Sequence, residues 1–183
     1  MDQVNAADPR VDEVDGQRVP RELAFARRTY DWVKRLLPTA SEALLLATRG
    51  HTLRRWEIPR DRYPRTSEGY HAWRKALADF HAECAEEILR AEGYPQDMME
   101  RVAGLIRREN WQVDAEGQAL EDADCLAFLE TKLSRFLEEW DEDKLFRVLQ
   151  GTLGKMSPAA RAWIPRLSMG PEAKKALVNL GML

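Results

Sequence analysis

The stretch "SEALLLATRGHTLRRWEIPR", residues 41–60, decides the fold, because it runs from an apolar helix directly into a basic segment. Thr39 or Ser41 can cap a helix whose residues 43–47 are all apolar. A helix that is apolar on every side must be covered by its neighbours. We therefore expect 41–50 to be a helix at the centre of the molecule, with His51 emerging at its end.

The rest of the chain is predicted to be helical as well. Leucine, alanine, glutamate and arginine dominate, valine and isoleucine are sparse, and no clean period-2 alternation occurs. The fold class is therefore all-α: a compact single-domain bundle of roughly seven or eight helices of typical length. The expected helices cover 20–37, 41–50, 67–91, 95–106 and 119–139, followed by the segment 141–156 and by two short helices in 157–164 and 171–180. Residues 1–19 form an N-terminal arm with a short helix, 20–156 a helical core, and 157–183 a C-terminal helical appendage.

Composition limits the class of protein. The chain has 183 residues and a net charge of -3, which argues against a surface devoted throughout to nucleic acid. Cys84 and Cys125 both fall in apolar helical patterns and are expected to be buried free thiols. The acidic start has no apolar stretch typical of a signal peptide, and no run is long enough to cross a bilayer. These features indicate a cytoplasmic protein without a membrane partner, and nucleic acid is not an expected partner.

Histidines and acids supply the candidate catalytic residues. His81 shares a helical face with Leu77 and Cys84, so it points towards the core. It is either a satisfied core histidine or, together with His51, a metal ligand. Asp124 borders the apolar side of "LEDADCLAFLE", residues 120–130, and a carboxylate there needs a cation, a metal or hydrogen-bond donors.

The acids of this segment have a second interpretation. Glu121, Asp122 and Asp124 are close to the start of the expected helix, where acidic side chains favour the positive end of the helix dipole. We take Glu121, Asp122 and Glu109 as supporting acids for a site.

The arginines form a candidate anion site. If the helix of 41–50 continues, Arg54 and Arg55 lie near His51 on one face. Arginine offers planar, paired donors that suit phosphate, and a tryptophan adds a flat surface. The candidate anion-binding residues are Arg54, Arg55, Trp56, Arg60 and Arg74. Alternatively, these arginines pair with internal acids such as Glu109, Glu121, Asp122 and Glu130.

Three segments in order, "ALLLATRGHT", "HAECAEEILRAEGYP" and "EDADCLAF", resemble the HD superfamily of metal-dependent phosphohydrolases over about residues 22–135. The resemblance implies a divalent metal (Mn, Fe, Ni or Mg) held by His51 and Asp124, with His81 as a further ligand. The chain departs from the family pattern, because Thr52 replaces the aspartate of the His-Asp doublet. The family's first histidine also has no counterpart, since Arg27, Arg28 and Tyr30 occupy that region.

A second resemblance covers more of the chain. "HTLRRWEIPR", "YHAWRKALADFHAE" and "LEDADCLAFLE" are similar to segments of the domain of unknown function 4202 family, over about residues 4–165. That family has no established activity to carry over.

Three functions follow as hypotheses. The first is a phosphohydrolase for a small phosphorylated metabolite or nucleotide, with a metal on His51 and Asp124 activating water. In it His81 transfers a proton or binds the metal, while Arg54 and Arg55 hold the phosphate. The second is a non-catalytic helical module that binds an anionic ligand or a protein. The third is RNA binding through the arginines with Trp56 or Trp111.

Overall fold

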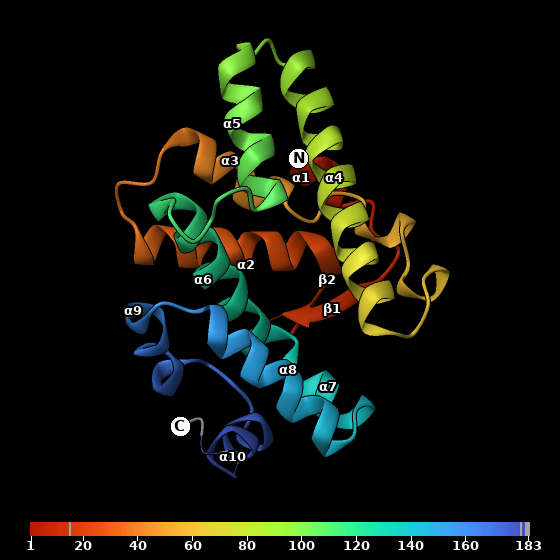
Figure 1. Cartoon of the computed structure of the whole chain (residues 1–183), viewed down its shortest axis with the longest axis vertical. Coiled ribbons are helices and arrows are strands. Elements are labelled where there is room, and N and C mark those ends of the chain that lie inside the picture. Colours follow the sequence, from red (N-terminus) through yellow and green to blue (C-terminus); the bar gives the residue numbers. More distant parts are fainter. Residues whose placement is uncertain (15, 180, 182–183) are drawn as a thin grey trace.

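The computed structural model of the chain describes residues 1–14, 16–179 and 181, and over these residues the expected all-α class is confirmed (Figure 1). The only strands described are β1 (Val11–Val14) and β2 (Gln17–Pro20), which pair as an antiparallel hairpin. The α-helices are α1 (Asp2–Asn5), α2 (Arg21–Leu36), α3 (Glu42–Gly50), α4 (Ser67–Ala91), α5 (Gln96–Arg107), α6 (Ala115–Thr131), α7 (Leu133–Glu139), α8 (Glu142–Lys155), α9 (Pro158–Arg161) and α10 (Pro171–Asn179). Short 3-10 turns occur at Arg55–Glu57, Arg60–Arg62 and Ile164–Arg166.

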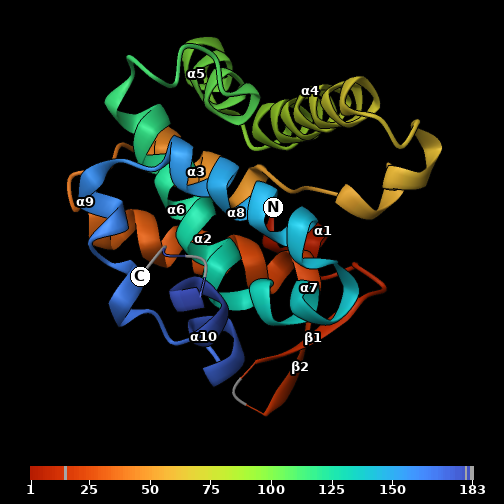
Figure 2. The same ribbon diagram turned by 60° about the horizontal axis from the view of Figure 1, so that its bottom comes forward.

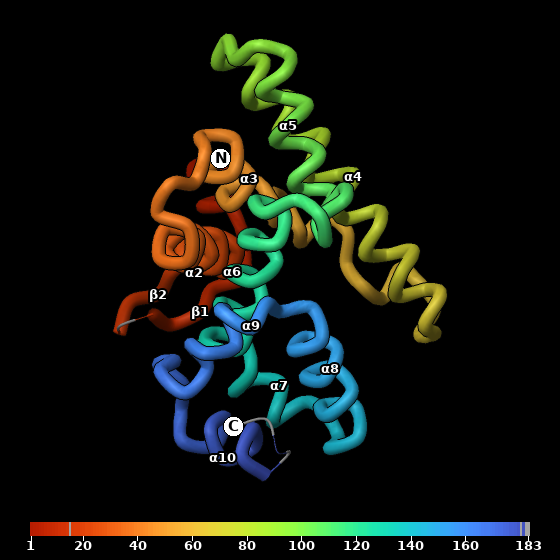
Figure 3. Tube along the Cα trace, turned by 60° about the vertical axis from the view of Figure 1, so that its left-hand side comes forward, coloured from red at the N-terminus to blue at the C-terminus, as the bar shows by residue number. Residues whose placement is uncertain are grey.

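Helix α3 lies among α2, α4, α5 and α6, as its apolar sequence predicts. The Ser41 hydroxyl accepts the Leu44 N–H at 3.2 Å and so fixes where the helix begins. Leu44 and Ala47 are fully buried. The paired helices α4 and α5 stand at one end of the molecule and α10 at the other, with α2 and α6 between them (Figures 1 and 3). This arrangement places the end of α3 beside α4 and α6.

Helix α3 ends before the basic segment. Arg54 and Arg55 are expected to share a helical face with His51 only if this helix continues, and it does not. His51 is the C-cap, and Arg54 takes a left-handed conformation with φ of 52°. A left-handed residue ends the helical path, so Arg54 and Arg55 leave it in different directions.

Other boundaries also differ from the expectation. The predicted helix over 119–139 begins earlier, at Ala115, and is broken at Lys132 into α6 and α7. Thr66 caps α4 through its hydroxyl, which accepts the Gly69 N–H at 3.1 Å. The described residues contain ten α-helices, more than the expected seven or eight, because the expected helix over 119–139 is two helices and the N-terminal arm adds the short α1.

The N-terminal arm contains a hairpin that the sequence pattern does not reveal. Its residues are exposed or only half-buried, so no buried face exists to impose alternating hydrophobicity. The hairpin lies beside α7 (Figure 2), and Asp12 is 3.7 Å from the Arg135 guanidinium of that helix.

The C-terminal helices add to the same apolar core as α2 and α6. Ile164, Leu167 and Leu177 are almost completely buried in it. No helix among the described residues has the length and apolar content needed to span a membrane.

Candidate functional site

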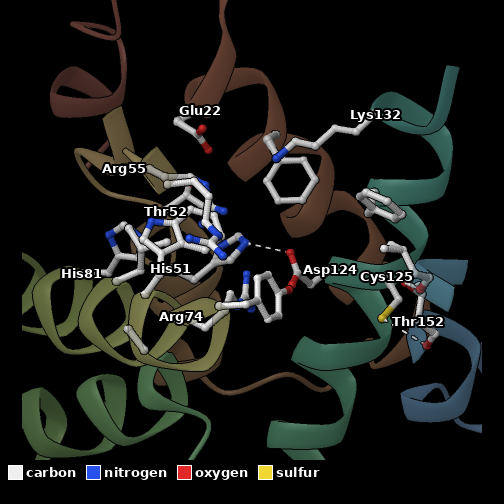
Figure 4. A pocket seen from close by; sticks show the side chains of 18 of the residues that line it. Glu22, His51, Thr52, Arg55, Arg74, His81, Asp124, Cys125, Lys132 and Thr152 are labelled. Atoms are coloured by element: carbon white, nitrogen blue, oxygen red, sulfur yellow. Dashed lines mark hydrogen bonds and ion pairs between the residues drawn. The ribbon is translucent and has the colours of Figure 1, made fainter. Parts of the chain in front are cut away.

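A pocket of about 630 Å³ opens between α2, the segment after α3, α4, and the helices α6 to α8 (Figure 4). Its volume is in the range of small-molecule sites. Its described lining includes His51, His81 and Asp124, the three residues predicted to be catalytic, together with Arg55, Arg60 and Arg74 from the predicted anion site.

The lining is strongly cationic. Among the described residues, ten arginines and lysines line it against three carboxylates. The cations are Arg10, Arg21, Arg55, Arg60, Arg74, Arg108, Lys132, Arg135, Lys144 and Lys155, and the acids are Glu22, Glu121 and Asp124. A concave wall of one charge sign concentrates ions of the opposite sign, so the pocket favours an anion.

Five of these cations have no carboxylate of the described residues within ion-pair distance: Arg55, Arg60, Arg74, Lys132 and Lys144. Arg60 is bound to backbone carbonyl oxygens and Lys144 is exposed, which leaves Arg55, Arg74 and Lys132 as cations that are at least half-buried. The Arg55 guanidinium lies 4.9 Å from the Trp73 ring centroid, and Lys132 Nζ lies 3.3 Å from that of Phe25. Both therefore rest on aromatic faces and keep their hydrogen-bond donors available.

The electrostatics agree with this geometry. Burial, offset in part by Glu22 and reinforced by Arg55, lowers the pKa of Lys132 to about 8. Burial likewise lowers the pKa of Arg55, although a guanidinium stays charged at neutral pH. Lys132 and Arg55 are therefore buried in surroundings that disfavour their positive charge when no anion is bound.

His51 and Asp124 meet across the wall of the pocket (Figure 4). His51 Nε2 is 3.3 Å from Asp124 Oδ1, and His51 Nδ1 is 2.8 Å from the Thr48 carbonyl oxygen. Burial alone would raise the pKa of Asp124, but the hydrogen bond to His51 and the charges of Arg108 and Arg74 hold it well below its usual range. Asp124 is therefore an ionised carboxylate that is already compensated.

Arg108 supplies much of that compensation. It caps α5 with a left-handed φ of 63°, which directs its side chain towards α6. Its Nη2 donates to Asp124 Oδ2 at 3.2 Å, and its Nε lies 2.9 Å from Glu121 Oε2. Lys155 Nζ lies 3.3 Å from the other Glu121 oxygen. Arginine and acids thus form an internal network beside the pocket, but its arginine is Arg108, which the alternative interpretation does not name.

His81 is positioned by the basic segment itself. Its Nδ1 is 2.6 Å from the Leu53 carbonyl oxygen, so Nδ1 carries the proton and donates it. Burial, followed by the charge of Arg55, lowers the pKa of His81 to about 3. The ring is neutral at physiological pH, and its Nε2 is a buried acceptor with no hydrogen-bond partner among the described residues.

The donor set does not fit a catalytic divalent metal. His51 and Asp124 are adjacent, but the described residues contain no group of three or more His, Cys, Asp or Glu side chains that could hold an ion. A catalytic metal normally has at least three protein ligands. Arg108 also occupies the second oxygen of Asp124 and places a positive charge where the metal would bind.

Four of the predicted residues lie outside the described lining of the pocket. Arg54 pairs with Glu57 at 2.7 and 2.8 Å, and Trp56 sits in the adjacent 3-10 turn. Asp122 accepts hydrogen bonds from the Ser157 backbone and hydroxyl at 2.7 and 2.6 Å, which fixes the start of α9. Glu109 is exposed at the end of α5.

Arg60 does line the pocket, but its guanidinium donates to the carbonyl oxygens of Tyr63 and Pro64 at 2.8 Å each. These bonds hold the loop before α4 in place.

Sequence reasoning overlooked Glu22, Arg108 and Lys132. Lys132 follows Phe128 and Leu129 by four and three residues, so a cation on an apolar helical face was a usable signal. Glu22 is in the first turn of α2, where an acid needs no special explanation. The position of the Arg108 side chain depends on a left-handed backbone conformation that no sequence pattern predicts.

Comparison with known proteins identifies a family. No curated protein and no solved structure matches the chain. The sequence model of one family, described as a domain of unknown function, matches residues 1–178. Because this match covers nearly the whole chain, the protein belongs to the DUF4202 family.

Proposed function

We propose that the protein binds a small phosphorylated metabolite or nucleotide in the cationic pocket, with Arg55, Arg74 and Lys132 as its phosphate ligands. The observation that carries the proposal is the presence of these three cations in one pocket without carboxylate partners among the described residues. A phosphate group would supply the missing negative charge and accept several charge-assisted hydrogen bonds.

The pocket's size supports a small ligand rather than a polymer. About 630 Å³ accommodates a molecule of sugar-phosphate or nucleotide dimensions. The chain's net charge of -3 supports the same choice, because a chain with an excess of acidic residues lacks the overall basic charge typical of nucleic-acid-binding domains.

The proposal is tested by thermal unfolding with inorganic phosphate, ribose 5-phosphate, glucose 6-phosphate, AMP and ATP as probes. A probe at ~100 times its dissociation constant should stabilise the folded protein by about 2.7 kcal/mol. The double variant Arg55→Ala/Arg74→Ala should lose most of this stabilisation.

Arg65→Ala is the matched control, because Arg65 is exposed and is not among the described lining residues. If no probe stabilises the wild-type protein, or if the double variant responds as the control does, the proposal is wrong.

A phosphohydrolase is the second candidate, supported by the contact between His51 and Asp124 at 3.3 Å. The two-ligand donor set does not fit a catalytic metal, so binding is the better supported function. Release of inorganic phosphate from the same probes, measured with Mn²⁺, Fe²⁺, Ni²⁺ and Mg²⁺, separates the two. Turnover that His51→Ala abolishes would establish the hydrolase.

A further inference from the structure

Besides its cations, the pocket contains buried polar atoms for which the described residues provide no partner. Glu22 Oε2, Thr52 Oγ1, His81 Nε2 and Arg108 Nη1 are all buried and unpartnered, and all four residues line this one pocket. An unpaired buried polar atom is costly, and native proteins rarely gather several of them in one place. The cluster indicates a ligand that pairs with them.

Two of these atoms only accept hydrogen bonds. His81 Nδ1 donates to Leu53, so His81 Nε2 presents a lone pair, and the side chain is almost fully buried. An ionised phosphate oxygen is itself an acceptor and cannot pair with this nitrogen. His81 therefore needs an O–H or N–H group from the ligand.

Glu22, on another wall of the pocket, also needs a hydrogen-bond donor from the ligand. One of its oxygens accepts from Arg10 Nη2 at 2.9 Å, and the other is unpartnered in a residue that is 1% exposed. Figure 4 shows this carboxylate turned towards the space that Arg55 and Lys132 border. A carboxylate repels phosphate, so its presence among the phosphate ligands indicates a hydrogen-bond donor on the ligand.

We propose that the ligand is a hydroxylated phosphate ester, such as a sugar phosphate or a nucleoside phosphate, whose hydroxyl groups donate to Glu22 Oε2 and His81 Nε2. This inference rests on the proposed function and specifies its ligand class. Thr52 Oγ1 and Arg108 Nη1 complete the match, since a hydroxyl both donates and accepts and a guanidinium N–H donates to an ester or hydroxyl oxygen. The dianion of a simple alkyl phosphate has no hydrogen-bond donor and leaves both acceptors unpaired.

Isothermal titration of the intact protein with matched probes tests the inference. Ribose 5-phosphate, glucose 6-phosphate and AMP carry hydroxyl groups, whereas n-butyl phosphate offers the same phosphate without them. We expect the tightest hydroxylated probe to bind at least tenfold more tightly than n-butyl phosphate, because a site built for hydroxyl groups rejects an analogue that lacks them.

The outcomes separate the two proposals. If n-butyl phosphate binds as tightly as the best hydroxylated probe, the ligand class is wrong while phosphate binding stands. If no phosphorylated probe binds, the proposed function itself fails, and the ligand class fails with it.

Two variants assign the selectivity to Glu22 and His81. Glu22→Gln removes the charge with little change in shape. His81→Asn keeps an amide N–H near the position of Nδ1 and removes the Nε2 acceptor. Each should reduce the preference for the hydroxylated probe by about threefold or more, and Glu22→Gln should leave n-butyl phosphate binding unchanged or tighter.

A purely structural role would weaken both probes in parallel. Glu87→Gln serves as the control, because Glu87 is exposed on α4 and is not among the described lining residues. An unchanged preference in both variants would overturn the assignment of the hydroxyl-binding atoms.

Discussion

At the scale of single residues, the pocket contains charges that its own walls do not neutralise. Arg55, Arg74 and Lys132 have no carboxylate of the described residues in ion-pair contact, whereas Arg108 has two. Burying uncompensated charge costs folding free energy. The presence of Arg55, Arg74 and Lys132 in the pocket is therefore better explained by binding of a ligand than by a contribution to stability. Arg108, in contrast, is placed by its ion pairs with Glu121 and Asp124.

If the pocket binds phosphate as proposed, Lys132 makes that binding sensitive to pH. Its pKa of about 8 means that the ammonium loses its proton well below the ordinary range of lysine. The second ionisation of a phosphate monoester is complete near pH 7, so only the protein's charge changes between pH 7 and 9. We expect affinity for ribose 5-phosphate to fall as pH rises through this interval.

Titration at several pH values checks this expectation. In Lys132→Met the affinity should be lower at pH 7 and nearly constant up to pH 9. An equally steep fall in the variant would mean that another group is responsible.

Asp124 distinguishes an anion site from a metal site. Asp124→Asn removes a negative charge from the pocket wall, and one charge at ~10 Å with an effective dielectric constant near 20 contributes on the order of 1 kcal/mol. Phosphate probes should bind roughly fivefold more tightly. The folded state should lose about 1–3 kcal/mol, because His51 and Arg108 lose a charged partner.

Calorimetry and chemical denaturation measure the two effects of Asp124→Asn. If Asp124 instead held a metal that binds the phosphate, the substitution would abolish binding.

At the scale of elements, α6 separates two groups of acids that are adjacent in sequence. Glu121 and Asp124 line the pocket, while Asp122 accepts hydrogen bonds from Ser157 at the start of α9 and from Gln118 one turn earlier in α6. In the segment "EDAD", residues 121–124, Asp122 therefore stabilises the fold, whereas Glu121 and Asp124 line the pocket. Helical periodicity places these side chains on different faces, but it does not say which face lines the pocket.

Asp122→Ala should therefore destabilise the protein without changing ligand binding. The loss of three hydrogen bonds at a buried carboxylate predicts a decrease of about 2–4 kcal/mol in the free energy of unfolding. Asp31→Ala, at an exposed position of α2, should change it by less than about 0.5 kcal/mol. If Asp122→Ala lowered the affinity for phosphate probes, this division of roles would be contradicted.

The sequence predicted the elements better than it predicted the site. The apolar run before His51 predicted the central helix, because helices apolar all round are buried in any packing. The site depends on two left-handed residues, Arg54 and Arg108, which turn one arginine away from the pocket and the other into it. Few local signals predict a left-handed arginine, so Arg54 was favoured and Arg108 overlooked.

At the scale of the whole molecule, the C-terminal residues belong to the core that supports the pocket. Leu167 and Leu177 are almost fully buried in the same apolar cluster as α2 and α6. Removing residues 157–183 would expose this surface and also release Asp122. Truncating even one buried leucine to alanine typically costs about 2–5 kcal/mol, a large part of a total stability of about 5–15 kcal/mol.

The fragment 1–156 should therefore not unfold cooperatively. Circular dichroism during heating, with the full chain as reference, checks this expectation. A sharp transition within a few degrees of the full chain would make residues 157–183 a dispensable appendage.

The central claim is that Arg55, Arg74 and Lys132 together bind a phosphate group, and anomalous diffraction from crystals soaked in tungstate tests it most directly. Tungstate has the shape and charge of a phosphate dianion, and its scattering marks its position without reference to any enzyme activity. We predict a strong anomalous peak in the pocket, within hydrogen-bond distance of the two guanidinium groups and Lys132 Nζ. Peaks confined to the outer surface, with this space occupied by water alone, would contradict the account.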